Sequence, residues 1–320
     1  MAVISVVIPI SNQSMRLKKS LQHLLAQQDA NFEIILIDDA STDDSLQLAR
    51  SILDGRPGTQ ILSHKKSLGL WHTRREGISL ARGSMLLFLD PREWLEPGTL
   101  KRLSDTMLSF NVDMVQMKRQ RYVHNVPLKI NDHPEAQYWQ VYSDDEYRRL
   151  TRFVGVGSCI TPFCGDKLYR TDLLREAADI DFNGRWGEAQ VLNINYLRLA
   201  RSLILTDFAG INADWVHNYF TFQFSRLDDY KRLHTLKSCL CADRESVDRE
   251  LLDCLHHHIH ELLGELAWTP EAVSYFMGRE LENPLWRQAG LTENIDELIA
   301  GAHTSLRRRR LKAILKRLVR

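Results

Sequence analysis

The first hundred residues alternate between two kinds of segment, and this alternation limits the possible folds more than any other feature of the chain. Short apolar runs rich in β-branched residues, typical of buried strands, are separated by longer stretches whose apolar residues recur three and four positions apart, as on one face of a helix. Strands that alternate with helices predict parallel β-α-β units. We therefore expect an α/β fold, with a Rossmann-like mixed sheet flanked by helices.

The boundaries of the expected elements follow from the same two periods. We predict strands at residues 5–10, 33–37, 59–63 and 85–89, and helices at residues 15–27, 41–53 and 69–81. Ser41 or Thr42 is the expected N-cap of the second helix, because a hydroxyl at that position satisfies a free backbone N–H group. After about residue 220 the pattern is helical to the end of the chain, so a mostly helical C-terminal region is expected.

Acidic residues follow two of the predicted strands at the point where each strand ends. Asp38 and Asp39 close the second strand, and Asp90 closes the fourth. In an open parallel sheet, ligands bind in the crevice outside the carboxyl ends of the strands. Taken singly, each aspartate is also an ordinary turn residue. Their occurrence at two strand ends favours a binding site at this edge of the sheet.

Composition excludes several classes of protein. Apolar residues make up 44% and charged residues 26% of the chain, as in ordinary globular proteins, and the net charge of +1 gives no sign of a nucleic-acid partner. The five cysteines form no metal-binding pair of the CxxC type, which suits a reducing compartment. No apolar run is long enough to span a bilayer, and the start of the chain lacks the basic segment of a signal peptide. We therefore expect a cytoplasmic protein.

Five short motifs occur in order along the first 174 residues. They are ISVVIPISN at 4–12, FEIILIDDASTDDS at 32–45, GLWHTRREGISLARG at 69–83, MLLFLDPREWLEPGTL at 85–100 and KLYRTDLL at 167–174. In this order and at about these spacings, residues 1 to about 220 resemble a family 2 glycosyltransferase of the GT-A fold. The resemblance implies transfer of a sugar, with inversion, from a nucleotide-sugar donor, usually a UDP-sugar and often with Mg²⁺ or Mn²⁺, to a hydroxyl acceptor.

The resemblance also divides the chain and assigns the donor side. It implies a nucleotide-sugar-binding half at residues 1–110 and an acceptor-side half at 111–219, and the helical pattern described above makes residues 220–320 a separate region. Carboxylates accept hydrogen bonds from an imide N–H group and from ribose hydroxyls, and guanidinium groups suit phosphate oxygens. The implied nucleotide contacts are Pro9, Ser11, Asn12, Asp38, Asp39, Arg74 and Asp90. The alternative for Arg74 is a surface charge on its helix.

The acidic motif after the fourth predicted strand departs from the family pattern. The family usually has two aspartates two positions apart that hold a divalent ion, whereas this chain has Asp90-Pro91-Arg92-Glu93. Arg92 replaces a hard oxygen ligand with a permanent cation. Three readings stay open: Asp90 and Glu93 are the metal ligands, Arg92 neutralises the leaving diphosphate in place of a metal, or the site has decayed.

A second departure concerns the general base. The family usually has an acidic pair before an apolar helix, and one aspartate of that pair removes the acceptor's proton. Here the segment is Trp186-Gly187-Glu188-Ala189, so Glu188 is the predicted base and the alternative is a helix-capping residue. With Asp90 and Arg92 it completes the predicted catalytic set. Lys167 and Trp186 are predicted on the acceptor side, with packing as the alternative for the KLYR segment.

The last fourteen residues, 307–320, contain eight lysines and arginines around an apolar stripe formed by Leu311, Ile314, Leu315 and Leu318. A helix of this kind lies on anionic lipid at about 1 kcal/mol per basic residue. The alternatives are a solvated tail and a nucleic-acid contact. The prediction is thus a hexosyltransferase-like enzyme of surface-polysaccharide or lipopolysaccharide assembly, cytoplasmic and peripheral on the inner membrane face, with a glycan or glycolipid acceptor. The alternative is a catalytically silent relative that binds a nucleotide-sugar, a glycan or a protein.

Overall fold

The computed structural model describes residues 4–27, 30–123, 126–127, 136–151, 159–180, 182 and 188–214. The chain divides into two compact units, Met1–Leu236 and Lys237–Arg320, and every described residue belongs to the first. The predictions for Trp186, for the helical region and for the basic segment at residues 307–320 therefore lie outside the described residues.

The described elements alternate between strands and helices through most of the chain. The strands are β1 (Ile4–Ile10), β2 (Phe32–Asp38), β3 (Thr59–Ser63), β4 (Met85–Phe88), β5 (Glu93–Leu95), β6 (Met114–Val123), β7 (Val126–Pro127), β8 (Val141–Ser143), β9 (Lys167–Arg170) and β10 (Ser202–Asp214). The helices are α1 (Ser14–Leu25), α2 (Ser45–Leu53), α3 (Leu70–Leu80), α4 (Thr99–Phe110), α5 (Asp144–Thr151), α6 (Thr171–Ala177) and α7 (Glu188–Leu199).

These strands form one mixed sheet in the order β3-β2-β1-β4-β9-β6-β10-β5, with β7 beside β6 and β8 beside β10. The first four strands run parallel to one another, with Val6 opposite Ile34 on β2 and Leu87 on β4. Strand β9 is antiparallel to both neighbours, β4 and β6. The predicted Rossmann-like mixed sheet is confirmed, and residue 110 lies inside a continuous domain because β6 and β10 complete the same sheet.

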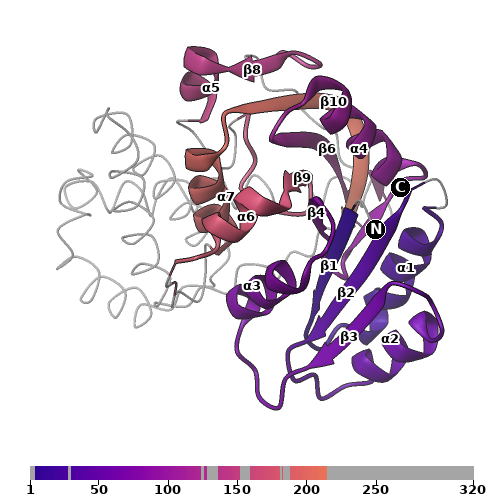
Figure 1. Cartoon of the computed structure of the whole chain (residues 1–320). Helices are drawn as coiled ribbons and strands as arrows, with labels where there is room; N and C mark the ends of the chain where they lie inside the picture. Colours follow the sequence, from indigo (N-terminus) through magenta and orange to yellow (C-terminus); the bar gives the residue numbers. More distant parts are fainter. Residues whose placement is uncertain are drawn as a thin grey trace, which may run out of the picture. The chain divides into compact units, whose positions relative to one another are not determined.

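Helices cover both faces of this sheet (Figure 1), with α1 and α2 on one side and α3, α6 and α7 on the other. Alternate side chains of β1, such as Val6 and Ile8, share a buried cluster with Leu21 of α1 and Leu103 of α4. On the opposite face α3 lies close to β1: a Cβ atom at Gly77 would stand 2.3 Å from a methyl group of Val7. Close approach at this glycine brings the preceding turn of α3 toward the edge where the acidic residues lie.

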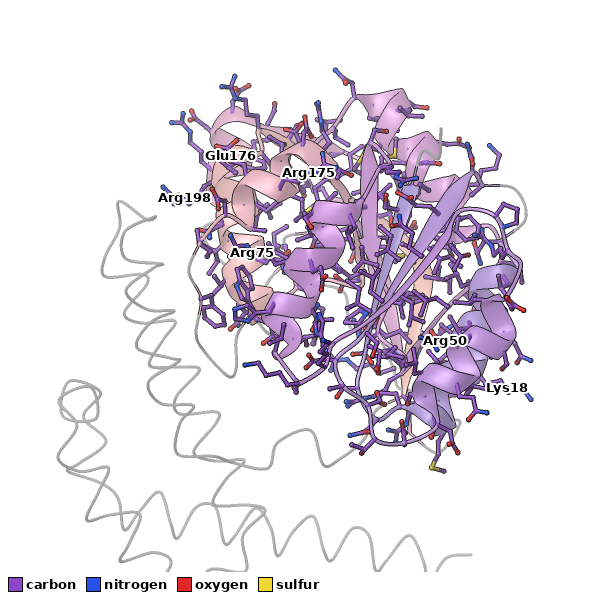
Figure 2. All side chains as sticks on the ribbon, turned by 60° about the horizontal axis from the view of Figure 1, so that its bottom comes forward. Lys18, Arg50, Arg75, Arg175, Glu176 and Arg198 are labelled. Carbon is purple, nitrogen blue, oxygen red and sulfur yellow. The ribbon has the colours of Figure 1, made fainter. Side chains whose placement is uncertain are left out.

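Charged side chains of the helices point outward (Figure 2). The labelled residues Lys18, Arg50, Arg75, Arg175, Glu176 and Arg198 are all exposed. Arg74 differs from its neighbour Arg75, because its side chain is 10% exposed whereas that of Arg75 is 46% exposed. The prediction that Arg74 could be a surface charge is therefore wrong.

The predicted N-cap of the second helix is also wrong. Helix α2 begins at Ser45 rather than at residue 41. The preceding residues form a loop with hydrogen bonds of its own: the Ser41 N–H donates to Asp38 at 3.2 Å, and the Thr42 N–H donates to the Asn12 side chain at 2.8 Å. Side-chain acceptors from the loop after β1 and from the end of β2 compete successfully with the helical hydrogen bonds of this segment.

Candidate active site

The turn that follows β4, residues 90–93, is called the Asp90 turn below, and its own side chains hold its shape. The Arg92 N–H donates to Asp90 Oδ1 at 3.0 Å, and the Asp90 N–H donates to Glu93 Oε2 at 3.1 Å. The guanidinium of Arg92 lies beside the same aspartate, with Nε 3.8 Å from Oδ1. Both side chains are about one quarter exposed, 23% for Asp90 and 24% for Arg92. Asp90 and Arg92 thus form a partly exposed ion pair just after the carboxyl end of β4.

Glu93 points away from the crevice. Its side chain is 5% exposed, and Oε1 accepts a hydrogen bond from Nη2 of Arg119 on β6. Oε2 accepts the Asp90 N–H and lies under Gly165, where a Cβ atom would be 2.3 Å from it. Burial opposes the charge of Arg119, but attraction from Glu93 and Asp166 raises the pKa of its guanidinium. Both carboxylate oxygens of Glu93 already accept hydrogen bonds, and Gly165 packs closely against Oε2. Glu93 is therefore not positioned to serve as the predicted second metal ligand.

Arg74 and Glu188 meet beside this turn although they are 114 residues apart in the sequence. Arg74 Nη1, on α3, lies 3.1 Å from Glu188 Oε1 at the first residue of α7. The guanidinium carbon lies 5.6 Å from the centre of the Phe88 ring, at the end of β4. Burial opposes the charge of Arg74, but attraction from surrounding groups, Cys164, Glu188 and Asp90 among them, raises its pKa. Two motifs predicted to serve donor and acceptor therefore converge on one point.

Asp39 anchors a neighbouring loop, and we call Asp38, Asp39 and residues 64–69 together the Asp39 loop. The Asp39 carboxylate accepts four hydrogen bonds, from His64 Nδ1 at 2.8 Å, Ser67 Oγ at 2.6 Å, the Leu68 N–H at 2.7 Å and the Gly69 N–H at 2.9 Å. Burial raises the pKa of Asp39, but these bonds outweigh it and hold the pKa below 3.8. A carboxylate offers about four acceptor positions. A nucleoside that binds Asp39 would have to replace one of the loop donors.

His64 joins the Asp39 loop to α3. Its Nε2 lies 2.6 Å from the Glu76 carboxylate, so the imidazole bridges two acidic side chains. Burial lowers the pKa of His64, but Asp39 and Glu76 outweigh it and raise the pKa above 6.5. His64 was not among the site residues predicted from the sequence. The available signal was a histidine directly after a predicted strand that parallels the strand ending in Asp38 and Asp39.

The other predicted nucleoside contacts have structural partners. Asp38 is 1% exposed and accepts the Ser63 hydroxyl at 2.9 Å as well as the Ser41 N–H. The exposed Asn12 has a left-handed backbone (φ 51°) and holds residues 42 and 43 through its side-chain oxygen. Pro9 is buried inside β1, opposite Ile37. Ser11 is exposed and lies beside Asp39, because its hydroxyl is 3.5 Å from the Asp39 backbone oxygen.

Lys167 is completely buried, which corrects the prediction of a direct acceptor contact. Its ammonium donates to Asp166 Oδ1 at 2.7 Å, to the Thr161 backbone oxygen at 2.9 Å and to the Phe163 backbone oxygen at 2.7 Å. Burial lowers the pKa of Lys167, an effect that Asp166 opposes. Tyr169, two residues later, is buried too, and its hydroxyl donates to Asn193 on α7 at 2.7 Å. The KLYR segment therefore holds the loop at residues 161–166 and α7 in place.

Comparison with known proteins identifies the family of this arrangement. The family model described as Glycosyl transferase family 2 matches residues 5–176, more than half of the chain. The chain belongs to glycosyl transferase family 2. The motifs from β1 to β9 that carry the resemblance thus lie in the part of the sheet that this family shares.

Curated relatives of this family 2 chain match segments of 102 to 182 residues. Glycosyltransferase GlyG of Streptococcus pneumoniae is 29% identical over 113 residues, 35% of this chain and 38% of that protein. The uncharacterized protein MT1568 of Mycobacterium tuberculosis is 35% identical over 102 residues, 32% of this chain and 31% of that protein. The putative glycosyltransferase EpsH of Bacillus subtilis is 25% identical over 182 residues, 56% of this chain and 50% of that protein. The chain thus spans about a third of the length of the first two.

Solved structures support the GT-A fold of the family 2 chain. The crystal structure of S. aureus TarS 1–349 in complex with UDP-GlcNAc has a TM-score of 0.64 at 19% identity, covering 89% of this chain and 79% of that one. The complex of the same TarS segment with UDP has a TM-score of 0.63 at 16% identity, covering 97% and 91%. At such identities the similarity shows the fold alone. None of the described helices is long and apolar enough to cross a bilayer.

The described residues do not suit the divalent ion that the family resemblance implies. A hard cation such as Mg²⁺ takes oxygen ligands, often one or two carboxylates together with substrate phosphates. Asp90 supplies one carboxylate, but Arg92 stands where a second is expected and Glu93 is buried against Arg119. Within the described ranges no group of three histidine, cysteine, aspartate or glutamate side chains could hold a metal ion. We therefore derive no step through a metal.

Proposed function

We propose that this chain is an inverting, hexosyltransferase-like enzyme that transfers a sugar from a UDP-sugar to a hydroxyl group of a glycan or glycolipid. The observation that carries the proposal is the contact of Arg74 with Glu188 at 3.1 Å beside the Asp90 turn. Arg74 comes from the donor-side motif, and Glu188 is the predicted base. In the proposed site, Arg74 is the cation for a donor phosphate and Glu188 is the carboxylate for an acceptor hydroxyl. Their contact supports the proposal because both groups must act on the same bound substrates.

The proposed reaction is a direct displacement at the anomeric carbon. Glu188 accepts the proton of the acceptor hydroxyl while the oxygen of that hydroxyl attacks the anomeric carbon of the donor. The bond from this carbon to the diphosphate breaks, and the leaving diphosphate keeps the electron pair. Arg74 and Arg92 hold the developing negative charge on the phosphate oxygens. Because Arg74 also contacts Glu188, it aligns the base with the donor.

On the donor side, the base and ribose are proposed to bind next to the Asp39 loop and Ser11. Asp39 is the acceptor for the imide N–H of uracil, and it exchanges one loop donor for this bond. Ser67 is the simplest donor to exchange, because its hydroxyl can turn toward other partners. The structure of TarS bound to UDP-GlcNAc, a protein of similar fold, supports the choice of UDP as the first nucleotide to test.

The proposed acceptor belongs to surface-polysaccharide or lipopolysaccharide assembly. Such acceptors are carried on lipid, and the eight basic residues at positions 307–320 suit an anionic membrane surface on the cytoplasmic side. Binding of the full chain to vesicles with and without anionic lipid tests this part of the proposal separately from catalysis.

The test of the enzymatic proposal compares binding with turnover. Titration calorimetry with UDP and UDP-sugars measures donor binding, and release of UDP with a membrane glycolipid extract measures transfer. We expect binding and acceptor-stimulated release, with Glu188→Gln retaining the first and losing the second. The second candidate, a catalytically silent relative, is favoured by Ala189, which stands where the family's base is expected. Donor binding without release by the wild-type chain in any acceptor extract would support this candidate.

A further inference from the structure

The acidic side chains around the proposed diphosphate site are each paired with a cation of the chain itself. The four pairs are Asp90 with Arg92, Glu93 with Arg119, Glu188 with Arg74, and Asp166 with Lys167. A divalent ion binds where carboxylate charge is in excess. Here each carboxylate is compensated by a cation of the chain, and a divalent ion added among these four cations would be repelled.

The charge at the Asp90 turn equals that of a loaded metal site. Two carboxylates and one divalent cation sum to zero, and so do Asp90 and Glu93 of this turn together with their partners Arg92 and Arg119. The two arrangements therefore present a diphosphate with a similar net charge. They differ in form, because guanidinium offers planar N–H donors that match phosphate oxygens, whereas a metal offers empty coordination positions.

Arg119 removes the remaining ligand candidate. It reaches Glu93 from β6, and its guanidinium carbon stacks 4.5 Å from the centre of the Phe163 ring. Its side chain is 14% exposed, so the pair with Glu93 is largely shielded from water. Turning Glu93 toward Asp90 would leave this buried guanidinium without its carboxylate, which is strongly unfavourable. Arg119 therefore keeps Glu93 away from any ion at Asp90.

We propose that Arg74 and Arg92 form a cradle that binds the donor's diphosphate without a divalent cation, and that Arg119 is a positioning residue that withholds Glu93 from metal binding. This inference rests on the proposed function, since it concerns the donor of the same reaction. Arg74 contributes a buried Nε that has no hydrogen-bond partner among the described residues and an Nη1 that lies 3.1 Å from Glu188. The cradle supplies the charge compensation that the family resemblance assigns to a metal.

The first test titrates UDP into the full wild-type chain, once with Mn²⁺ and once with EDTA. We expect the two dissociation constants to agree within about threefold, and Arg92→Ala or Arg74→Ala to weaken binding roughly 10–100-fold, as expected for loss of charge-assisted hydrogen bonds. The matched control is Arg75→Ala, one residue from Arg74 and exposed. Binding that EDTA abolishes and Mn²⁺ restores would overturn the inference and leave the proposed function standing. No binding of UDP under either condition would overturn both.

The second test rebuilds a metal site. Arg92→Asp places two aspartates two positions apart, so we expect UDP binding by this variant to be lost in EDTA and recovered with Mn²⁺. Circular dichroism confirms that the variant is folded. A folded Arg92→Asp variant that binds UDP equally well with and without Mn²⁺ would overturn the cradle, because it would show that the charge at position 92 does not decide metal dependence.

The third test concerns Arg119 alone. Arg119→Met frees the Glu93 carboxylate beside Asp90. We expect Mn²⁺ to tighten UDP binding by this variant about tenfold or more, because the freed carboxylate can then serve as a metal ligand. Arg119→Lys, which keeps the charge, is expected to remain indifferent to Mn²⁺. A role of Arg119 in folding alone would lower stability in both variants without producing a response to Mn²⁺, and that result would overturn its positioning role.

Discussion

The Asp39 loop and the Asp90 turn lie at the ends of two strands of one sheet, yet they satisfy their carboxylates in different ways. Asp38 and Asp39 accept hydrogen bonds from hydroxyls, backbone N–H groups and one histidine. At the Asp90 turn, Asp90 and Glu93 each lie against an arginine. Except for His64, the donors to Asp38 and Asp39 are neutral and leave a negative charge in place, whereas an arginine cancels it. The first region keeps its acidity for a ligand with N–H and O–H donors, and the second can receive a phosphate.

This difference predicts how each region responds to the loss of one partner. Removing one member of a buried ion pair leaves an uncompensated charge and costs about 3–5 kcal/mol. Removing one neutral hydrogen bond from a carboxylate that keeps three others costs about 1–3 kcal/mol. The variants below measure whether the two regions differ in this way, beginning with the largest effect.

Glu188→Gln is expected to have the largest effect, and on turnover. Glutamine keeps the size of the side chain and an oxygen for Arg74 but cannot accept the acceptor's proton. We expect the rate of sugar transfer to fall roughly 10²–10⁴-fold, the usual contribution of a general base, with UDP affinity changed less than about threefold. Initial rates of UDP release in the presence of acceptor measure the rate of transfer, and titration calorimetry measures the UDP affinity. Unchanged turnover would remove Glu188 from the mechanism.

Lys167→Met tests the buried ion pair between Lys167 and Asp166, which is next in sequence to the Gly165 contact with the Asp90 turn. Lys167 and Asp166 are both fully buried, so methionine leaves the Asp166 carboxylate without its cation. We expect the free energy of unfolding to fall by about 3–5 kcal/mol. Urea unfolding followed by circular dichroism measures it. The control is Arg170→Ala, since Arg170 is 45% exposed and its ion pairs should contribute at most about 1 kcal/mol. Equal effects of the two variants would contradict the comparison.

The sequence predicted the strands far better than the contacts between their ends. Predicted strand 59–63 agrees with β3 residue for residue, because the Pro57-Gly58 turn marks where it begins. The Asp39 contacts with Ser67 and Gly69 span 28 and 30 residues, so they depend on how β3 and α3 close over the sheet. Asp39 was found as a site residue, but the donors that occupy it were not.

Arg119 was missed for a related reason. It lies in a strand, MVQMKRQRYV, whose basic residues look like the solvent side of a sheet. The role of Arg119 depends on its ion pair with Glu93, which lies 26 residues earlier in the sequence. Glu93 is on β5, opposite β10, rather than in the crevice. Sequence motifs indicated which residues gather at the edge of the sheet. They did not show which carboxylate turns inward, since that depends on the space left by Gly165.

Asp39→Asn probes the region of neutral donors. An asparagine keeps one oxygen, but its NH₂ group faces two of the loop's donors, so about half of the four hydrogen bonds are lost. We expect the free energy of unfolding to fall by about 2 kcal/mol and UDP binding to weaken in parallel. The control is Asp44→Asn, an exposed residue before α2 whose side chain makes no capping bond. A loss as large as that of Lys167→Met would show that both regions depend on charge alike.

His64→Gln is expected to have the smallest effect and to show it through pH. The pKa of His64 is raised in the folded chain, so its charge stabilises the fold fully below the unfolded value near 6.5, and this stabilisation is lost as the pH rises through the folded pKa. Asp39, whose pKa is lowered, contributes above 3.8 and loses its contribution only in more acidic solution. Between these limits the imidazolium lies between two carboxylates, which is the one place in the Asp39 loop where a charge is paired.

Urea midpoints at about pH 5.5 and about pH 8 measure this contribution. The wild-type chain should lose roughly 1 kcal/mol or less between the two, since Glu76 is 37% exposed and water screens its part of the bridge. His64→Gln should be destabilised at the lower pH and nearly equal to wild type at the higher one. His72→Gln, an exposed histidine on α3, is the control and should follow the wild-type profile. If His64→Gln costs the same at both pH values, the bridge acts as a neutral hydrogen bond, and the Asp39 loop contains no paired charge at all.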